Sequence, residues 1–305
     1  MGMRVAVTGG TGFIGQALVK ALTARGDEAI VVTRSVPEAS RRYNGVKYAT
    51  WEEAAAADRI GRVDAIVNLA GESINQRWTA ASKRRIVQSR LQATDNAAAI
   101  AAAQPDRPKV VVNASGISVY GPSDHEVFDE SGRPGNDFLS DVVTQWEAAA
   151  DRIPAVRLVK LRIGLVVHDS GGAFPLMALP YKLFVGGKVG SGKQWLPWIH
   201  LDDMVRLLLF CLDTDSLSGP VNACAPEAVT NEQFGRAIAR AFGRPHWFPV
   251  PAFVFRTLFG EMSSLLLEGQ HAVPRRAVEA GFQFRYPTAI EALQEISSKS
   301  GQASL

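Results

Sequence analysis

Cysteine and histidine are scarce in this chain, which has two cysteines and five histidines among 305 residues. Cys211 and Cys224 both lie in apolar stretches, and neither belongs to a CxxC pair or a His/Cys cluster. Two cysteines cannot form a disulfide framework, and we expect both to be small core residues. The composition therefore predicts neither a disulfide-stabilised secreted domain nor a metal site.

Long hydrophobic runs are lacking as well. A membrane-spanning helix needs about 20 consecutive apolar residues, and the run from Val205 to Leu212 is far shorter. Strand-like sequence begins at Arg4, which leaves no room for a signal peptide before it. We therefore expect a cytoplasmic protein that has no membrane partner.

The chain also lacks any concentration of positive charge. Its formal net charge is +3, and its Lys and Arg residues are scattered, with only short clusters such as Lys83-Arg84-Arg85. A nucleic-acid-binding surface needs a concentrated basic face. We interpret this cluster as a solvated helix face and predict no nucleic-acid partner.

What the chain does contain is ample material for a hydrophobic core. Apolar residues make up 47% of it and charged residues 21%, which is typical of a globular protein and not of a disordered one. A length of 305 residues suits one large domain or two modest ones. No internal repeat is visible.

A glycine-rich turn near the N-terminus is the most informative stretch. The apolar run Val5–Thr8 is followed by Gly9, Gly12 and Gly15, and then by the amphipathic stretch Gln16–Leu22. This order predicts a strand, a tight turn and a helix. The first glycine permits the turn, the second lets the backbone approach a pyrophosphate, and the third lets the helix pack close to the strand. The start of the helix would then face a bound anion.

The turn resembles that of the short-chain dehydrogenase/reductase superfamily, in its extended epimerase/dehydratase-like branch. Further stretches resemble the atypical group called epimerase family proteins, which are often labelled nucleotide-sugar epimerases or cell-division inhibitors. These stretches are Asn68–Glu72, Gln76–Trp78, Ser89-Arg90, Val119–Gly121, Trp146-Glu147, Gly190–His200, Gly260–Met262 and Gly281–Pro287.

The resemblance covers nearly the whole chain and implies an α/β fold. We expect a Rossmann-type doubly wound parallel sheet with a smaller C-terminal α+β domain on the substrate side. Residues 1–167, completed by about 199–225, would form the dinucleotide-binding domain. Residues 168–198 and 226–305 would form the smaller domain.

The end of the second expected strand, Glu28–Thr33, indicates which dinucleotide binds. Proteins that bind NAD usually place an acidic residue here for the ribose hydroxyl, whereas an Arg accommodates the additional phosphate of NADP. This strand is followed by Arg34 and no acid, while Arg41 and Arg42 add charge nearby. We therefore predict NADP as the cofactor, the alternative being that Arg34 is an ordinary surface residue.

Other cofactor contacts follow from the resemblance. The buried strand Asp64–Gly71 would end beside the cofactor, and the long helix expected over Gln76–Ala103, possibly broken near its start, carries Arg90 and Thr94 on one face. The candidate cofactor-binding residues are Gly9, Thr11, Gly12, Phe13, Ile14, Arg34, Leu69, Ala70, Gly71, Glu72, Arg90 and Ser115.

Later elements follow from hydrophobic patterning. We expect strands over Lys109–Ala114 and Val156–Val166, separated by a helix over Asp137–Arg152. Asp202 would cap a helix that begins before Met204. These elements continue the alternation of strand and helix that a parallel sheet requires.

The superfamily's acid/base pair is missing from this sequence. Its enzymes use a Tyr whose pKa is lowered by a Lys four residues later on the same helix. Alignment on Glu147 puts Leu139 at the Tyr position and Val143 at the Lys position. A shift by one residue brings in Phe138 and Val142 instead. Neither alignment supplies a proton-transfer group.

The residue that usually holds the substrate is also replaced. By the same resemblance, the usual Ser corresponds to Gly116, although Ser115 and Ser118 lie close by. Tyr120 and His200 are the other catalytic candidates. Tyr120 is alternatively a packed aromatic residue, and His200 a structural hydrogen-bonding residue.

The substrate side departs from nucleotide-sugar enzymes too. The Arg that helps to hold the diphosphate in those enzymes is replaced here by Leu196. Trp195 and Trp198, with Lys193 and Arg77, favour a pocket for a flat or apolar group with an anionic handle. Alternatively, both Trp residues seal the core between the domains.

Two functions remain open. One is an NADP-dependent oxidoreductase or epimerase-like enzyme with a rearranged active site. The other is a non-catalytic NADP-binding regulator or redox sensor. The enzyme is favoured because the superfamily is mostly enzymatic, which is an analogy of fold. We expect an unidentified small-molecule substrate and a monomer or homodimer.

Overall fold

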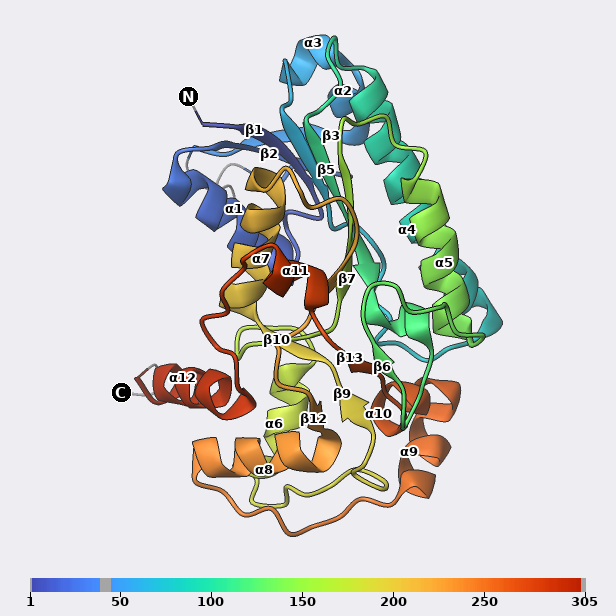
Figure 1. Ribbon diagram of the computed structural model, residues 1–305, viewed down its shortest axis with the longest axis vertical. Coiled ribbons are helices and arrows are strands. Elements are labelled where there is room, and N and C mark those ends of the chain that lie inside the picture. Colours follow the sequence, from blue (N-terminus) through green and yellow to red (C-terminus); the bar gives the residue numbers. More distant parts are fainter. Residues whose placement is uncertain (1, 39–44, 303–305) are drawn as a thin grey trace.

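A computed structural model describes residues 2–38 and 45–302 of the chain. Its central feature is a sheet in the upper half of Figure 1, with α4 and α5 on one side and α1 and α7 on the other. The smaller lower half contains α6, α8, α9 and α12. The expectation of an α/β Rossmann-type fold is confirmed.

The main sheet has seven parallel strands in the order β11-β7-β5-β4-β1-β2-β3. Three further strand pairs, β10-β8, β12-β9 and β13-β6, lie outside this sheet. The strands are β1 (Arg4–Thr8), β2 (Glu28–Thr33), β3 (Lys47–Thr50), β4 (Ala65–Asn68), β5 (Val110–Gly116), β6 (Val127–Phe128), β7 (Leu158–Ile163), β8 (Leu165–Val167), β9 (Trp195–Leu196), β10 (Trp198–His200), β11 (Gly219–Ala223), β12 (Val229–Thr230) and β13 (His271–Ala272).

Helices connect the parallel strands and build the smaller half. They are α1 (Phe13–Arg25), α2 (Trp51–Ala55), α3 (Ala57–Ile60), α4 (Ala80–Ala102), α5 (Phe138–Ala150), α6 (Phe174–Lys182), α7 (Leu201–Asp213), α8 (Asn231–Phe242), α9 (Ala252–Phe259), α10 (Ser264–Leu267), α11 (Arg275–Glu279) and α12 (Ala289–Gln302). Two short 3₁₀ helices are η2 (Ile117–Tyr120) and η3 (Gly260–Ser263).

The strand order places a topological switch point between β1 and β4. The chain leaves β1 toward β2 and β3, and then crosses back to β4 on the other side of β1. Ligands of open α/β sheets bind outside the carboxyl ends of the strands at such a point. The turn after β1 and the turn after β4 are therefore the first places to look for a site.

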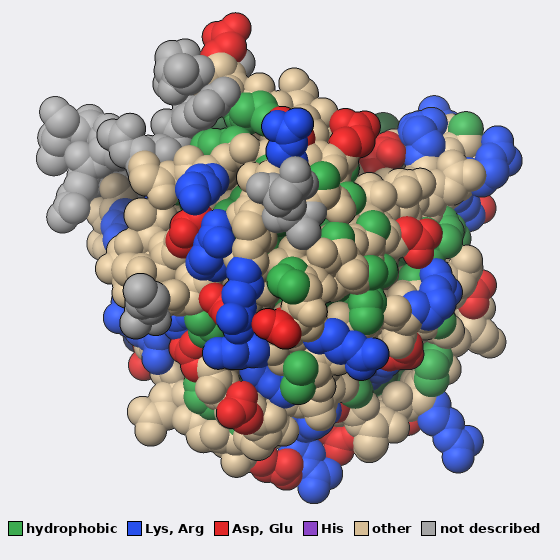
Figure 2. All heavy atoms as spheres, turned by 90° about the horizontal axis from the view of Figure 1, so that it is seen from above, with side chains coloured by type: hydrophobic (Ala, Val, Ile, Leu, Met, Phe, Trp, Pro, Cys, Tyr) green, Lys and Arg blue, Asp and Glu red, His purple; other side chains and the backbone are tan. Residues whose placement is uncertain are grey.

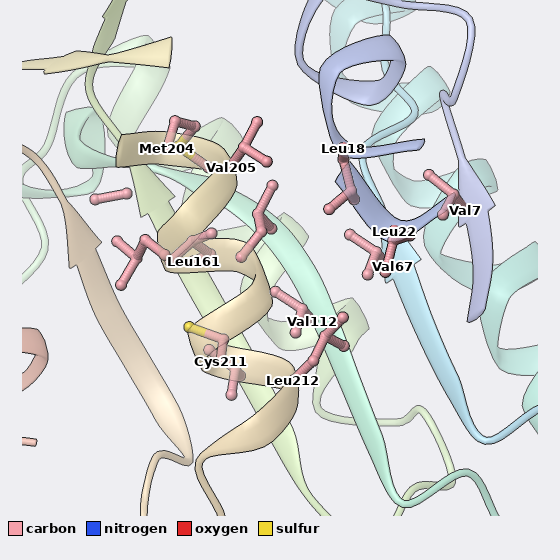
Figure 3. Close-up of a cluster of buried hydrophobic side chains, with 14 of the residues drawn as sticks. Val7, Leu18, Leu22, Val67, Val112, Leu161, Met204, Val205, Cys211 and Leu212 are labelled. Carbon is pink, nitrogen blue, oxygen red and sulfur yellow. The ribbon is translucent and has the colours of Figure 1, made fainter. Parts of the chain in front are cut away.

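Each face of the sheet is covered by its own hydrophobic cluster, because successive strand residues point to opposite faces. Figure 3 shows the cluster under α1 and α7, where Val7 and Val67 of the sheet lie near Leu18 and Leu22, and Val112 lies near α7. Residues on the other face, such as Ala6, Ile66 and Val111, pack against α2, α4 and α5. Both faces are buried, which is usual for a parallel sheet.

The strand expected over Val156–Val166 is interrupted, which corrects the sequence-based prediction. It divides at Gly164 into β7, which belongs to the main sheet, and β8, which pairs with β10. The Leu165 amide donates a 2.7 Å hydrogen bond to the Pro197 carbonyl oxygen. A Cβ at Gly164 would lie 2.5 Å from that same oxygen. The close approach of two backbones thus requires glycine at the break.

Two helix starts also differ from expectation. Helix α7 begins at Leu201, and its cap is His200, whose side chain accepts a hydrogen bond from the Asp202 amide, so Asp202 is not the cap. Helix α4 begins at Ala80, where Thr79 and Ser82 form a reciprocal capping pair. The segment before it, from Gln76, is not helical.

The C-terminal segment contributes to both halves of the molecule. Ala277 and Phe282 pack into the cluster on the sheet, whereas Ala289 and Leu293 pack with Phe234 of α8 in the smaller half. The division into 1–167 with 199–225, and 168–198 with 226–305, stays a prediction.

Candidate functional site

The glycine-rich turn closes tightly after β1. Gly9 has a left-handed φ of 66°, and its carbonyl oxygen accepts a 2.9 Å hydrogen bond from the Gly12 amide. Gly12 is the cap of α1, with no capping side chain and no acidic residue in the first helical turn. The positive end of the helix dipole at this position is therefore not compensated by the helix's own side chains.

The three glycines differ in what a larger residue would meet at each position. A Cβ at Gly15 would lie 2.2 Å from the Gly9 carbonyl oxygen, and one at Gly9 would lie 2.7 Å from the Leu69 carbonyl oxygen. These two residues are glycine because the backbone packs against them. A Cβ at Gly12 would meet only the Gly9 oxygen, at 3.2 Å. Its outer side is open, as a turn that receives a pyrophosphate requires.

Phe13 and Ile14 lie inward from this turn, while Thr11 is exposed. A Cβ at Gly171 would lie 2.7 Å from the Phe13 ring, so the loop that follows β8 packs on this ring. Ile14 packs against the core under α1. Packing of these two side chains holds the start of α1, and with it the turn, in place.

A ladder of buried polar side chains lies beneath the carboxyl ends of the strands, and sequence reasoning missed it. Thr8, Asn68 and Asn113 occupy the same register on β1, β4 and β5. The Thr8 hydroxyl donates to Asn68 Oδ1 at 2.5 Å, and Asn68 Nδ2 donates to Asn113 Oδ1 at 2.6 Å. The Ala70 amide donates to Thr8 Oγ1 at 3.3 Å. This ladder holds the turn after β4 against the turn after β1.

Arg90 braces that second turn, and its predicted contact with the cofactor stays a prediction. Its guanidinium donates to the Glu72 carbonyl oxygen at 3.0 Å and lies over the Trp146 ring, whose Nε1 donates to Thr94. Burial lowers the pKa of Arg90 to about 10. A Cβ at Gly71 would lie 3.4 Å from the Arg90 side chain, so Arg90 and Gly71 are in contact.

Arg34 lies where the cofactor argument needs a cation. It directly follows β2 at the carboxyl end of the sheet and is exposed. The neighbouring Thr33 hydroxyl donates to the Ser35 carbonyl oxygen at 3.2 Å. Arg41 and Arg42, named with Arg34 in the sequence analysis, lie outside the described residues.

The positions that should carry the acid/base chemistry are apolar in the structure. A Cβ at Gly116 would lie 3.3 Å from Val143 Cγ2 and 3.2 Å from the Ser118 hydroxyl oxygen. Val143 is buried, and Leu139 is half-buried one turn earlier on α5. The strand end and the helix therefore face each other at these positions, but Gly116, Leu139 and Val143 supply no ionisable group.

Two of the catalytic candidates belong to a buried charge network. The Ser115 hydroxyl donates to Glu147 Oε1 at 2.6 Å, and Arg162 donates to both oxygens of Glu147 at 2.8 and 3.0 Å. The Tyr120 hydroxyl accepts from Arg162 at 2.9 Å and donates to Asn222 Oδ1 at 2.7 Å. Ser115, Arg162 and Asn222 share one register across β5, β7 and β11, a pairing that only the tertiary structure reveals.

This network leaves Tyr120 unsuited to proton transfer near neutral pH. Its side chain is 3% exposed, and burial raises its pKa to about 12 despite the opposing influence of Arg162. Burial also disfavours the charge of Arg162, but the Glu147 carboxylate outweighs it, so the pKa of Arg162 is raised. The alternative interpretation of Tyr120, a packed aromatic residue, therefore fits the structure better than catalysis.

His200 is likewise a hydrogen-bonding residue in the interior. Its Nδ1 accepts from the Asp202 amide at 3.1 Å, so its Nε2 carries the hydrogen and donates to Glu295 Oε2 at 3.1 Å. It is buried against Tyr286 and His168. Burial lowers its pKa, against the pull of Asp202 and Glu295. It caps α7 and joins it to α12, so the alternative interpretation of His200, a structural hydrogen-bonding residue, fits the structure better than catalysis.

The predicted substrate residues are not brought together. Trp198 is 1% exposed in the core of the smaller half, with Nε1 donating to the Glu227 carbonyl oxygen at 3.1 Å. It therefore cannot form a pocket with Trp195, which is half-buried and stacks on His271 at a centroid distance of 4.1 Å. The two residues belong to different strand pairs, Trp195 to β9 with β12 and Trp198 to β10 with β8. Lys193 and Arg77 are exposed on separate loops.

A second aromatic cluster, which the sequence analysis did not single out, lies at the start of α5. Trp78 and Phe138 meet edge to face with centroids 5.2 Å apart, and the Lys83 ammonium lies 4.8 Å from the Phe138 ring centre. Lys83 also pairs with Glu261 of η3. Lys83 thus joins α4 to the smaller half, which corrects its interpretation as part of a purely solvated face.

Within residues 2–38 and 45–302 no group of His, Cys, Asp and Glu could hold a metal ion. Among the helices described there, none is long and apolar enough to cross a bilayer.

Comparison with known families identifies two matching regions. The model described as the NAD dependent epimerase/dehydratase family matches residues 5–138, which span β1 to the first residue of α5. A model described as a domain of unknown function (DUF1731) matches residues 250–296. The first region contains both turns of the candidate site.

Relatives match over almost the full length. Epimerase family protein YfhF of Bacillus subtilis is 39% identical, covering 96% of this chain and 98% of the relative. Epimerase family protein SDR39U1 of Homo sapiens is 40% identical, covering 96% and 99%. A crystal structure of the human protein with NADPH superposes with a TM-score of 0.88, at 39% identity, covering 97% of this chain and 99% of that one.

Proposed function

This chain belongs to the NAD-dependent epimerase/dehydratase family, and we propose that it is an NADPH-dependent oxidoreductase whose active site lacks the usual Tyr–Lys pair. The observation that carries the proposal is the open, uncompensated turn at Gly12. Support comes from the human relative, whose crystal structure holds NADPH.

The chain offers a separate group for each part of the cofactor. The turn from Gly9 to Gly12 and the start of α1 would hold the pyrophosphate, and Arg34 would hold the additional phosphate that distinguishes NADPH from NADH. The turn Leu69–Glu72, braced by Arg90, would lie along the dinucleotide. When bound, the nicotinamide ring would supply hydride donation and acceptance.

The same geometry limits what the protein contributes to the reaction. Gly116, Leu139 and Val143 provide no proton donor at the positions where the family uses one. Ser118 carries the hydroxyl nearest to this place, because its oxygen lies beside Gly116. We propose that it positions a substrate oxygen by a hydrogen bond, while the proton comes from water or from the substrate itself.

A second candidate function is favoured by one observation. Val143 packs against Gly116, as expected if the site no longer performs proton transfer. The protein would then bind NADPH as a ligand and act as a redox sensor or regulator. Both functions need the turn at Gly12, and only the first needs hydride transfer.

We propose that the protein acts in the cytoplasm on a small-molecule substrate. We also propose that it is a monomer or a homodimer. Cys211 and Cys224 are free thiols in the interior, which is compatible with a reducing compartment.

Hydride transfer separates the two functions. The purified protein would be incubated with NADPH deuterated at C4 and a panel of aldehydes, ketones, enones and quinones, and the products analysed by mass spectrometry. Deuterium in a product, absent with a Gly12→Val control, would establish the oxidoreductase. Saturable NADPH binding with no deuterium transfer to any compound would favour the regulator.

A further inference from the structure

The smaller half of the molecule ends in an exposed apolar surface. We call this the tip surface; it is formed by α6, the turn at residues 183–190, the segment 244–250 and α9. The two segments pair with each other: the Trp247 and Phe248 amides donate to the Gly186 carbonyl oxygen at 2.9 and 3.1 Å, and the Gly190 amide donates to the Val250 carbonyl oxygen at 2.9 Å. Segment 244–250 lies at the lower end of the long axis in Figure 1.

Helix α6 is apolar on two faces, although only one is covered. Phe174, Ala178 and Tyr181 face the core of the smaller half. Leu176, Leu179 and Leu183 recur three and four residues apart, so they form a second stripe, and all three are exposed. A surface helix normally places polar residues on its outer face, so this stripe needs a partner.

The aromatic residues of the tip surface protrude instead of lining a groove. Trp247 is 64% exposed, Phe253 67% and Phe184 53%. Helix α9 has no buried residue along its length. Side chains exposed by more than half stand out from their surroundings, which suits a flat partner better than an inserted peptide.

The backbone at Phe184 is strained in a way that keeps this ring outside. Phe184 has a φ of 64° and is the only non-glycine residue with positive φ in the described parts of the chain. Trp247 Nε1 donates to its carbonyl oxygen at 2.8 Å, and the Arg244 guanidinium lies 4.4 Å from its ring centre. A bulky residue in the left-handed region costs free energy and persists where surrounding contacts impose it, often for function.

The segments that form this surface carry charge of one sign. Residues 174–190 and 244–259 contain no Asp or Glu, but they hold Lys182, Lys188, Arg244 and Arg256. The acid Glu232 at the start of α8 pairs with Arg236 at 2.8 Å and interacts with Lys188. Like charges facing one another would disfavour a symmetric contact between two copies of the tip surface.

The opposite end of the molecule provides a contrast. Figure 2 looks onto that end and shows Lys and Arg interspersed with Asp and Glu. Glu28 there pairs with Arg4 and Lys47, and Arg62 pairs with Asp64. The tip surface therefore differs from the opposite end, because its segments carry exposed apolar rings and cations but no acidic residue of their own.

We propose that the tip surface docks on an anionic lipid bilayer. Its Trp, Phe and Leu side chains would enter the headgroup region, and its Lys and Arg residues would pair with lipid phosphates, which is the pattern of interfacial membrane attachment. This departs from the sequence-based expectation of no membrane partner, which considered only spanning segments. It is independent of the proposed oxidoreductase activity.

Sedimentation with vesicles tests the proposal. The full chain should bind vesicles of phosphatidylcholine and phosphatidylglycerol in equal parts, bind phosphatidylcholine alone much more weakly, and dissociate as salt is raised. The Lys182→Gln/Arg256→Gln variant should bind the anionic vesicles less tightly, by a factor on the order of thirty. The matched Arg107→Gln/Lys109→Gln variant, which removes two exposed cations at the amino end of β5, should bind like the wild type.

Separate variants test the contribution of the apolar side chains to vesicle binding. Trp247→Ser/Phe253→Ser should lose vesicle binding while keeping the wild-type circular dichroism spectrum. Phe184→Asn should also bind less, without a lower thermal midpoint, because Asn tolerates the left-handed backbone. A merely structural Phe184 would instead give a less stable variant with unchanged vesicle binding.

Three results would overturn the proposal. The first is no preference for anionic vesicles, and the second is equal weakening by the Arg107/Lys109 control. The third is a vesicle-free dimer, seen by analytical ultracentrifugation, that Trp247→Ser/Phe253→Ser converts to a monomer. That outcome would assign the tip surface to a second copy of the chain.

Discussion

Val143 of α5 lies directly opposite Gly116 at the end of β5, with its Cγ2 atom 3.3 Å from where a Gly116 Cβ would be. In relatives that use acid/base chemistry, these two positions are expected to hold a lysine and a serine. Here the isopropyl group of Val143 faces the glycine. The two positions therefore carry no ionisable group where the family's reaction needs proton transfer.

We predict from this relationship that the protein lacks ordinary nucleotide-sugar 4-epimerase activity. That reaction needs a base for the C4 hydroxyl proton, and general acid/base catalysis is worth about 10²–10⁴-fold. Incubation with UDP-sugars and either cofactor, followed by NMR, should show at most a trace of C4 inversion. Turnover on the order of 1 s⁻¹ would mean that another group performs the proton transfer.

Glycine substitutions should separate cofactor binding from stability. Gly12→Val should abolish NADPH binding and keep the thermal midpoint, because a side chain there meets only the Gly9 oxygen at 3.2 Å and otherwise projects toward the pyrophosphate. Gly15→Ala should lower the midpoint, since its Cβ would lie 2.2 Å from that oxygen. Scanning calorimetry with and without NADPH measures both. A Gly12→Val protein that still binds would show that the turn is structural only.

The buried pair of Glu147 and Arg162 should be essential for stability. Glu147→Gln leaves the Arg162 charge buried without a countercharge and turns an amide N–H toward the guanidinium, which should cost about 3–5 kcal/mol of unfolding free energy. The exposed pair of Asp95 and Arg152 supplies the control, and Asp95→Asn should have little effect. Urea unfolding measures both variants. Equal stabilities would contradict the role assigned to the network.

Tyr120 should lose its proton only at high pH. Its pKa is raised to about 12 in the folded protein, as is that of Tyr181, against about 10 when unfolded. The folded state then holds protons that the unfolded state loses, so this contribution to stability is full below pH 10 and falls as pH rises toward 12. A pH titration followed by tyrosinate absorbance should show one fewer tyrosine ionising at high pH in Tyr120→Phe than in the wild type. A Tyr120 that ionises near neutral pH would restore it as a catalytic candidate.

Local pattern predicted the main sheet and both turns of the site well. The Gly9–Gly15 spacing and the buried strand before Leu69 depend on neighbouring residues, so the sequence shows them directly. The sequence did not predict the strand break at Gly164 because its cause is Pro197, which is distant in the sequence. The network around Tyr120 escaped for the same reason, since Arg162 and Asn222 reach it through strand register. Trp198 looked like a pocket residue because sequence does not show which face of a short strand is covered.

The central claim is that the turn after β1 holds NADPH and that Arg34 reads its additional phosphate. Its most direct test is a calorimetric titration of NADPH and NADH into the wild type and Arg34→Ala. The wild type should bind NADPH more tightly than NADH. Loss of one charge-assisted contact in Arg34→Ala should cost about 1.5–3 kcal/mol for NADPH and little for NADH. Equal affinities for the two cofactors in the wild type would contradict the account.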